Sequence, residues 1–450
     1  MPVLTTMPTN PADELLLRIG RLRTLLNRVV SAPESWTDGS NRSQDRIEPL
    51  ACSSWAVCEE AWTQCLRWRQ SISDAFSVMM AVNASTSQTG NQLFLQVIAA
   101  AGSGKTQLCD AMLVSFNCYG LEHLTGFHSG VVSDDGRDLS LLSRINHKCL
   151  ITPEGDVLVA SPNFAELMSQ VRRIFDGKSG AVYKNTDQDK KWEGLRTPWI
   201  LAGTPAMIDY WDQSRLGDRF LRIMIDNPVQ DERRKIVLSA MNSEWEAVAE
   251  RSTEASGGVE AKMRRAYALT GGYCDWLREN SHRIDEITIS EEVVYKVADF
   301  AEFTADMRAK PNLDTRKLET HDSKEVPTRI GRQLIRLARC LAFVLNKREV
   351  DADVMRRVRK VALDSAGGKT LDVLKWMHAI EPRSGKTYQE AGGVMAVQLA
   401  RWASFESEAK CLAYLNFLLK IDVMEHVPCQ HSHGHWRMTP RVEALQKSLR

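Results

Sequence analysis

The stretch Ala99-Ala100-Ala101-Gly102-Ser103-Gly104-Lys105-Thr106 decides the fold of this 450-residue chain. It follows the apolar run Leu93-Phe94-Leu95-Gln96-Val97-Ile98 and precedes a helix-like segment, Gln107 to Phe116. This order predicts a strand, a phosphate-binding loop and a helix, because loop amides and a helix N-terminus converge on an anion. Lys105 is expected to reach the β- and γ-phosphates, and the Thr106 hydroxyl to hold Mg²⁺. We therefore expect ATP and Mg²⁺ to bind at Ala101, Gly102, Ser103, Gly104, Lys105, Thr106 and Gln107.

Composition places the chain among ordinary globular proteins. Hydrophobic residues make up 43% and charged residues 26%, and the formal net charge is only +1, so any nucleic-acid site must be local. No apolar run approaches the length of a membrane span, and Met1 to Asn10 lacks the pattern of a signal peptide. Ten scattered cysteines indicate reduced thiols rather than a disulfide framework. We expect a cytoplasmic protein.

Local patterns divide the chain into four regions. We expect a helical N-terminal region at 1–70, an α/β core at 71–230, a helical lid at 231–370 and a winged-helix domain at 371–450. An amphipathic helix is predicted over 12–30 and a loop over 31–47. Further strands are predicted around Leu150-Ile151, Asp156 to Ala160, Gly180 to Tyr183 and Pro198 to Ala202. The tail indicates three helices, the last from Glu406 to Leu419, and then two strands around His426 and Trp436.

A stripe of large side chains recurs at helical spacing before the core, at Trp55, Cys58, Trp62, Cys65 and Trp68. It is either a buried helix face or a surface that binds metal or stacks bases. The wide gaps between the cysteines do not suit a zinc site, which favours the buried face.

The segment Lys148-Cys149-Leu150-Ile151-Thr152-Pro153-Glu154-Gly155-Asp156 is the best candidate for the acidic strand that a phosphate loop needs. Glu154 stands where a catalytic glutamate would follow the strand. Pro153 takes the place of the usual metal-facing aspartate, so either Asp156 or a water would complete the Mg²⁺ shell. The alternative is a surface turn that happens to carry two acids.

Two later segments suggest further catalytic residues. Thr204 follows the apolar run Pro198-Trp199-Ile200-Leu201-Ala202-Gly203, where its hydroxyl could hold an attacking water. Arg219, in Leu216-Gly217-Asp218-Arg219-Phe220-Leu221, stands at the distance of an arginine finger that enters the ATP site of a neighbouring subunit. An ordinary surface ion pair is the alternative for Arg219.

From Ser73 to about Asp364, the chain resembles the AAA+ core of minichromosome-maintenance (MCM)-like helicases of phages and mobile elements. The resemblance rests on pieces in the family's order: the phosphate loop, Asp138-Leu139-Ser140-Leu141-Leu142, the acidic strand, Val171-Arg172-Arg173-Ile174-Phe175-Asp176-Gly177, Leu201-Ala202-Gly203-Thr204-Pro205 and Gly217-Asp218-Arg219-Phe220. The segment from Thr328 to Arg339 resembles the lid helix with the second sensor arginine. On that match Arg332 takes the role, with Arg329 as the competitor.

The resemblance implies a hexameric ring with ATP between subunits, and a hairpin that grips DNA. Here that hairpin would span 179–196. Lys184, Lys190 and Lys191 would contact phosphates beside aromatic side chains. A solvated hairpin of mixed charge is the alternative, because acidic residues alternate with the lysines.

The tail carries ten basic and eight acidic residues between positions 371 and 450, so it shows no strong electrostatic footprint. Winged helices bind DNA or dock onto proteins, and the sequence leaves both open. The cluster Cys429-Gln430-His431-Ser432-His433-Gly434-His435 suits a histidine-rich wing tip better than a zinc site, because a second ligand pair is missing.

The sequence thus predicts an ATP hydrolase that forms a ring, translocates on DNA and unwinds it. The alternative is an ATP-dependent assembly or regulatory switch that recruits a nuclease or transposase without unwinding. A small-molecule kinase is a third class, which the arginine finger and the long helical lid disfavour.

Overall fold

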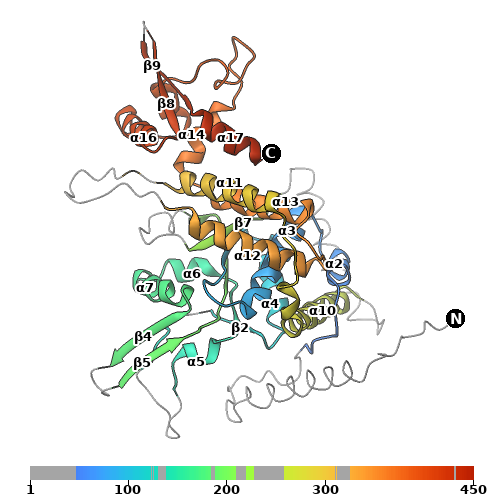
Figure 1. Ribbon diagram of the computed structural model, residues 1–450. Helices are drawn as coiled ribbons and strands as arrows, with labels where there is room; N and C mark the ends of the chain where they lie inside the picture. Colours follow the sequence, from blue (N-terminus) through green and yellow to red (C-terminus); the bar gives the residue numbers. More distant parts are fainter. Residues whose placement is uncertain are drawn as a thin grey trace, which may run out of the picture. The chain divides into compact units, whose positions relative to one another are not determined.

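The computed structural model describes residues 47–122, 124, 126–129, 138–183, 188–208, 219–227, 258–309, 311, 325–429 and 432–449. Residues Pro49–Arg450 form one compact unit around a parallel sheet (Figure 1). The five strands, in spatial order, are β2 (Cys118–Gly120), β3 (Cys149–Thr152), β6 (Trp199–Gly203), β1 (Phe94–Ile98) and β7 (Phe220–Met224). The expected α/β fold with a parallel sheet is confirmed.

Apolar side chains cover both faces of the sheet, as parallel strands require. Leu95 and Val97 of β1 point to one face, and Phe94 and Ile98 to the other. The first face packs on α2 (Trp55–Thr63), α3 (Gln70–Ala84), α4 (Lys105–Met112), α10 (Val259–Glu279), α11 (Glu291–Arg308), α12 (Thr328–Val344) and α13 (Ala352–Ser365). The second face packs on α5 (Leu141–Ile145), α6 (Gly155–Val159) and α7 (Phe164–Phe175).

A buried ion pair fastens α13 to α3 within the first helical layer. Asp74 of α3 is only 2% exposed, and each of its carboxylate oxygens lies 2.7 Å from a guanidinium nitrogen of Arg356. Arg357 lies beside the same carboxylate and donates from Nε to Ser77 Oγ. The pair satisfies charges that burial would otherwise penalise.

Two strand predictions need correction. Asp156 to Ala160 is not a strand but helix α6; its short apolar run Val157-Leu158-Val159 fits either structure by periodicity. Gly180 to Tyr183 lies in β4 (Lys178–Tyr183), which pairs only with β5 (Gln188–Glu193) in a hairpin outside the main sheet. Strands β2 and β7 were not predicted.

The C-terminal region contains the three expected helices and the two expected strands, with one more helix. These elements are α14 (Lys369–Met377), α15 (Ala396–Trp402), α16 (Glu408–Lys420), β8 (Met424–Cys429), β9 (Ser432–Met438) and α17 (Pro440–Ser448). Short 3-10 helices, η1 (Ser85–Ser87) and η2 (Ser281–Ile284), connect elements of the core.

In the stripe of tryptophans and cysteines, the first three residues form a buried helix face, whereas Cys65 and Trp68 follow the helix and are half-buried. Trp55, Cys58 and Trp62 of α2 are buried, and Trp62 Nε1 donates to Thr270 Oγ1 at 3.0 Å. The nine cysteines that the structure covers up to Cys411 are free thiols, as expected. Among the described helices, none combines the length and the apolar character that crossing a membrane requires. The helix predicted over 12–30 and nearly all of the loop after it lie outside the described residues.

Candidate functional site

The phosphate-loop sequence connects β1 to α4 as predicted. Gly102 and Gly104 have φ angles of +73° and +87°, the left-handed region where side chains are strained. Gly104 is the residue immediately before α4, so the loop turns directly into the helix N-terminus. These two glycines therefore aim the backbone amides of the loop and of the first helical turn at one point.

The side chains of the loop fit an anion. The Ser103 hydroxyl oxygen is buried and has no hydrogen-bond partner among the residues that the structure describes. Lys105 is 9% exposed at the first position of α4, and Thr106 and Gln107 beside it are half-buried, whereas Ala101 and Gly102 are exposed. A buried polar atom without a partner needs a ligand or a water to satisfy it.

The strand order brings the other predicted residues to the same edge of the sheet. Strand β6 pairs in parallel with β1 on one side and with β3 on the other. Because the carboxyl ends of parallel strands meet at one edge, Thr204 after β6 lies between the phosphate loop and Glu154 after β3. Ligands of open parallel sheets bind at this edge.

Asp156 and Thr204 form a tight pair across that edge. One carboxylate oxygen of Asp156 accepts from the Thr204 backbone N–H at 2.9 Å, and the other accepts from its hydroxyl at 2.8 Å. Asp156 sits in the first turn of the unexpected helix α6. The pair holds the Thr204 hydroxyl in one orientation, a link that sequence reasoning did not predict.

Glu154 is exposed at the residue that precedes α6, and its side chain does not cap the helix. Burial raises the pKa of Asp110 on α4, and the nearby carboxylates of Glu122 and Glu154 raise it further. Glu154 therefore reaches the electrostatic neighbourhood of the phosphate-loop helix. A cation or a phosphate-bound metal would relieve the repulsion among these acids.

Arg219 lies just before β7, at the amino ends of the parallel strands and thus opposite the phosphate loop. Its guanidinium carbon is 5.7 Å from the centre of the Phe175 ring, and its Nε is buried without a hydrogen-bond partner among the described residues. Burial and then the neighbouring Arg329 lower its pKa. Arg219 therefore lies far from the phosphate loop of its own chain, because the loop is at the carboxyl ends of the strands.

Two more arginines accompany Arg219. Arg172 at the end of α7 and Arg329 at the start of α12 both act on its charge, against the acids Asp176 and Glu325. Arg172 Nε and Arg329 Nη1 are also buried without hydrogen-bond partners in the described part of the chain. Arg329 Nη1 does lie 3.2 Å from Glu325 Oε1, but without hydrogen-bond geometry. We call Arg172, Arg219 and Arg329 the arginine cluster.

Arg332, the preferred second-sensor residue from the sequence, is not placed in this cluster. It is exposed and lines a 290 Å³ cavity with Arg336, Arg339 and Gln88. Arg336 donates to the backbone carbonyls of Thr89 and Asn91. The competitor Arg329, rather than Arg332, is the lid residue that lies beside Arg219.

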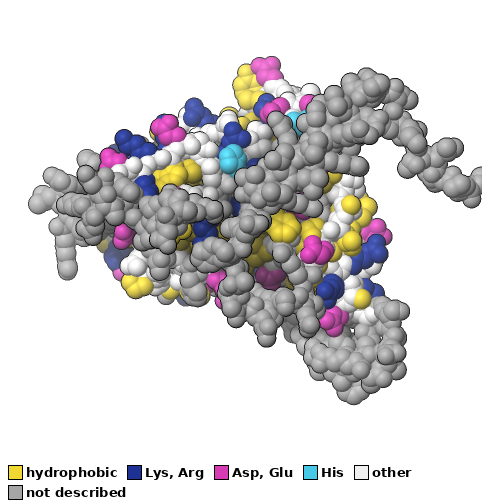
Figure 2. Space-filling model, turned by 90° about the horizontal axis from the view of Figure 1, so that it is seen from below, with side chains coloured by type: hydrophobic (Ala, Val, Ile, Leu, Met, Phe, Trp, Pro, Cys, Tyr) yellow, Lys and Arg dark blue, Asp and Glu magenta, His cyan; other side chains and the backbone are white. Residues whose placement is uncertain are grey.

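Of the three lysines expected to contact DNA, the two that the structure describes differ in their surroundings. Lys190 is 13% exposed and donates to Asp138 at 2.7 Å and to the Ser129 carbonyl at 2.9 Å. Lys191 is exposed, whereas Lys184 lies outside the described residues. On the face drawn in Figure 2, basic and acidic side chains are interspersed rather than gathered in one patch.

The structure shows no cluster of metal-ligating side chains among the residues it describes. His431 and the side chains of Cys429 and His433 fall outside that set. The choice between a metal site and a wing tip at this turn therefore stays a sequence-based expectation.

No protein-family model matches this chain, and no curated protein proves significantly similar to it.

Proposed function

We propose that this chain is an AAA+ ATPase of the MCM-like helicase class, which forms a ring, translocates on DNA and unwinds it. The region after residue 370 would be its winged-helix domain. The observation that carries the proposal is the group of residues at the carboxyl ends of β1, β3 and β6, which we call the loop edge of the sheet. There, a loop turned by two glycines carries Lys105 and the Ser103 hydroxyl, which has no hydrogen-bond partner among the described residues. This loop lies next to the strand end that holds the Asp156–Thr204 pair.

Each residue of this edge has a role that its chemistry supports. The loop amides and Lys105 would bind the phosphates of ATP. Glu154 would accept a proton from the attacking water, because it is exposed and held at the end of β3. Thr204 would orient that water, since Asp156 fixes the direction of its hydroxyl.

The donors at this edge also fit Mg²⁺, which prefers oxygen ligands. The Thr106 hydroxyl and the carboxylates of Asp156 and Glu154 would hold the ion directly or through water. When bound, Mg²⁺ neutralises charge on the phosphates. Asp156 already accepts two hydrogen bonds from Thr204, which favours a water between this carboxylate and the ion.

The arginine cluster supports a ring. Arginine groups stabilise the charge that develops on phosphoryl groups, but these lie at the edge of the sheet opposite the loop. They could reach a nucleotide only on a neighbouring copy of the chain. Arg219 and Arg329 are the residues that we assign to this role in trans.

The experiment that tests the proposal measures ATP turnover with and without single-stranded DNA. We expect DNA to stimulate turnover in the wild type and Lys105→Ala to lose it. A strand-displacement assay on forked DNA then tests unwinding. Negligible turnover that ignores DNA would contradict the motor and leave the nucleotide as an assembly ligand.

A second candidate is an ATP-dependent assembly switch on DNA. Pro153 in place of the metal-facing acid and the paired state of Lys190 favour it, since both weaken a motor. Such a switch would bind DNA with ATP and release no strand in the displacement assay.

A further inference from the structure

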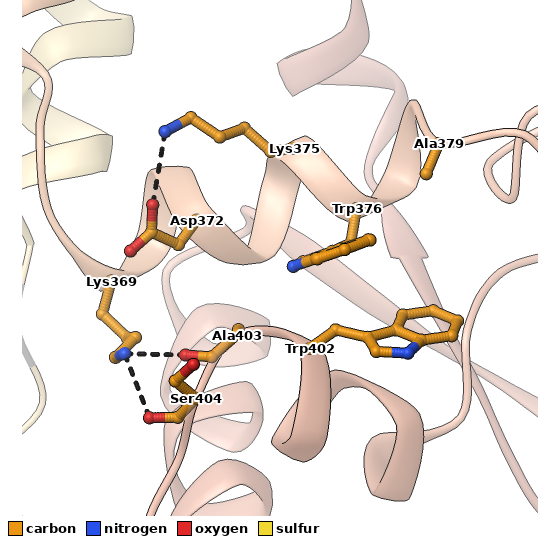
Figure 3. A pocket seen from close by; sticks show the side chains of 8 residues that line it. All are labelled: Lys369, Asp372, Lys375, Trp376, Ala379, Trp402, Ala403 and Ser404. Carbon is orange, nitrogen blue, oxygen red and sulfur yellow. Dashed lines mark hydrogen bonds and ion pairs between the residues drawn. The ribbon is translucent and has the colours of Figure 1, made fainter.

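A cavity of 390 Å³ lies in the C-terminal region, between α14 and the end of α15 (Figure 3). Lys369, Lys375 and Trp376 line it from α14, and Trp402 lines it from the end of α15. In Figure 3 the two indole rings lie at one end of the cavity and the two lysines at the other. This volume falls within the range of pockets that hold small organic molecules, roughly 300–1,000 Å³.

The aromatic end presents a fixed surface. The ring centres of Trp376 and Trp402 are 5.1 Å apart, with their planes tilted by 33°. Tyr388 supports Trp402 from 5.2 Å, so this indole is held between two aromatic neighbours. Both tryptophans are nonetheless only half-buried. Rigid, half-exposed aromatic rings are surfaces on which a planar group can stack.

The other end carries positive charge. Lys369 Nζ donates to the backbone carbonyls of Ala403 at 2.7 Å and Ser404 at 3.3 Å. The carbonyl oxygens and the Phe405 ring, whose centre is 5.2 Å from Nζ, orient this ammonium, and no carboxylate among the described residues pairs with it. Lys375 pairs with Asp372 at 3.3 Å, and both side chains are largely exposed, so this ion pair exchanges readily with other anions. Two cations thus face one carboxylate.

We propose that this cavity binds an unpaired nucleotide of single-stranded DNA, with the base against Trp376 and Trp402 and the phosphate beside Lys375 and Lys369. A stacking surface next to two cations that share one carboxylate complements a flat base joined to a phosphodiester. Duplex DNA does not fit, because its bases are stacked on one another and expose only their edges. The site is built without the phosphate loop, so its test needs neither ATP nor turnover.

The first test is photocrosslinking of the full-length protein to an oligonucleotide of about 15 thymidines in which some carry 5-iodouracil. After irradiation without nucleotide, the adducts are mapped by peptide mass spectrometry. We expect adducts on Trp376 or Trp402. Adducts confined to other segments, such as the β4–β5 hairpin, would overturn the proposal.

The second test measures affinity by fluorescence anisotropy of the same oligonucleotide without iodouracil. Trp376→Ala should weaken binding about tenfold, whereas Trp376→Phe should keep most of the affinity because a ring remains. Lys375→Ala should weaken binding less and reduce the salt dependence by about one counterion. Lys447→Ala, an exposed lysine on α17, is the matched control and should bind as the wild type does.

The outcomes separate DNA from other occupants. Equal affinities of wild type and Trp376→Ala overturn the proposal, as does stronger binding of duplex DNA or of single-stranded RNA. Displacement by an acidic, aromatic peptide but not by unlabelled oligo(dT) would assign the cavity to a protein partner instead. Circular dichroism of each variant shows whether a lost affinity reflects a lost fold.

Discussion

Two groups of partly buried arginines in this molecule differ in how their charge is satisfied. On α13, Arg356 and Arg357 lie against the carboxylate of Asp74, whose hydrogen bonds raise the pKa of Arg356. In the arginine cluster, burial lowers the pKa of Arg219, and buried nitrogens of all three side chains lack hydrogen-bond partners among the described residues. Within the part of the chain that the structure describes, the first group has hydrogen-bonded carboxylate partners and the second does not.

The difference separates a structural role from a functional one. Removing one partner from a complete buried pair leaves an uncompensated charge, which costs stability. Removing a cation that has no hydrogen-bonded carboxylate costs the fold less, and instead costs whatever the cation binds. The comparison therefore predicts opposite consequences for substitutions that are chemically alike.

Arg219→Ala should give the largest effect. We expect ATP turnover to fall about 1,000-fold, as for the loss of an arginine finger. The free energy of unfolding should change by less than about 1 kcal/mol, because no buried partner is left behind. Steady-state turnover and urea unfolding check the two parts on the same preparation.

Mixing Arg219→Ala with Lys105→Ala tests whether the cluster acts between copies. A mixed ring contains interfaces with an intact loop on one side and an intact arginine on the other, so part of the turnover should return. Without any recovery, and with both single variants assembling normally, the assignment in trans is wrong. Comparing the turnover of Arg332→Ala with that of Arg329→Ala shows which lid arginine acts together with Arg219. The structure favours Arg329, because it lies beside Arg219.

Asp74→Ala should affect stability rather than chemistry. It leaves Arg357, which is buried, with only the half-exposed carboxylate of Asp353, and we expect a loss of about 3 kcal/mol in the free energy of unfolding. Glu292→Ala is the matched control, since its pair with Lys296 is exposed and contributes little to stability. Turnover per folded molecule should stay unchanged. Similar losses for both variants would show that the burial of Asp74 does not matter.

Thr204→Val tests the loop edge in the same way. It removes the hydroxyl that donates to Asp156 while the backbone N–H bond remains. We expect kcat to fall about 100-fold, with nucleotide affinity within about threefold of the wild type. Thr204→Ser keeps the donor and should recover most of the rate. An unchanged kcat in Thr204→Val would remove Thr204 from the reaction.

Sequence reasoning predicted the features that a local pattern determines. The loop, its flanking strand and helix, and strands β3 and β6 follow from apolar periodicity and glycine positions, whereas the hairpin was expected from the family resemblance. It failed at α6, where three apolar residues after Asp156 fit a strand as well as a helix. It also missed the short edge strand β2, which has only three residues.

Contacts between distant residues could not be predicted in the same way. Thr204 and Asp156 were both chosen as site residues, yet nothing in the spacing indicated that they bond to each other. Trp376 and Trp402 carry no motif, and they meet only because α14 packs on α15. Arg172 was quoted as part of a motif, but its grouping with Arg219 depends on the sheet order.

The pair of Lys190 and Asp138 extends the comparison to the hairpin and predicts a small, pH-dependent effect. Burial alone would raise the pKa of Asp138, but donors from Lys190, Ser143 and Ser140 outweigh it and hold that pKa below its usual range. A depressed carboxyl pKa stabilises the fold above the unfolded value of about 3.9, and this contribution disappears as the pH falls toward the folded value.

Lys190→Met should therefore lower the free energy of unfolding by less than about 1 kcal/mol at neutral pH, because Asp138 is partly exposed. The difference from the wild type should stay constant down to about pH 5 and narrow below about pH 4, as Asp138 becomes protonated in both proteins. Urea midpoints across this range check it, and a difference that widens toward acid would contradict the pairing.

Lys191→Met, in contrast, should leave stability unchanged and weaken DNA binding more than Lys190→Met does, because of these two lysines only Lys191 has an exposed ammonium that is available to a phosphate.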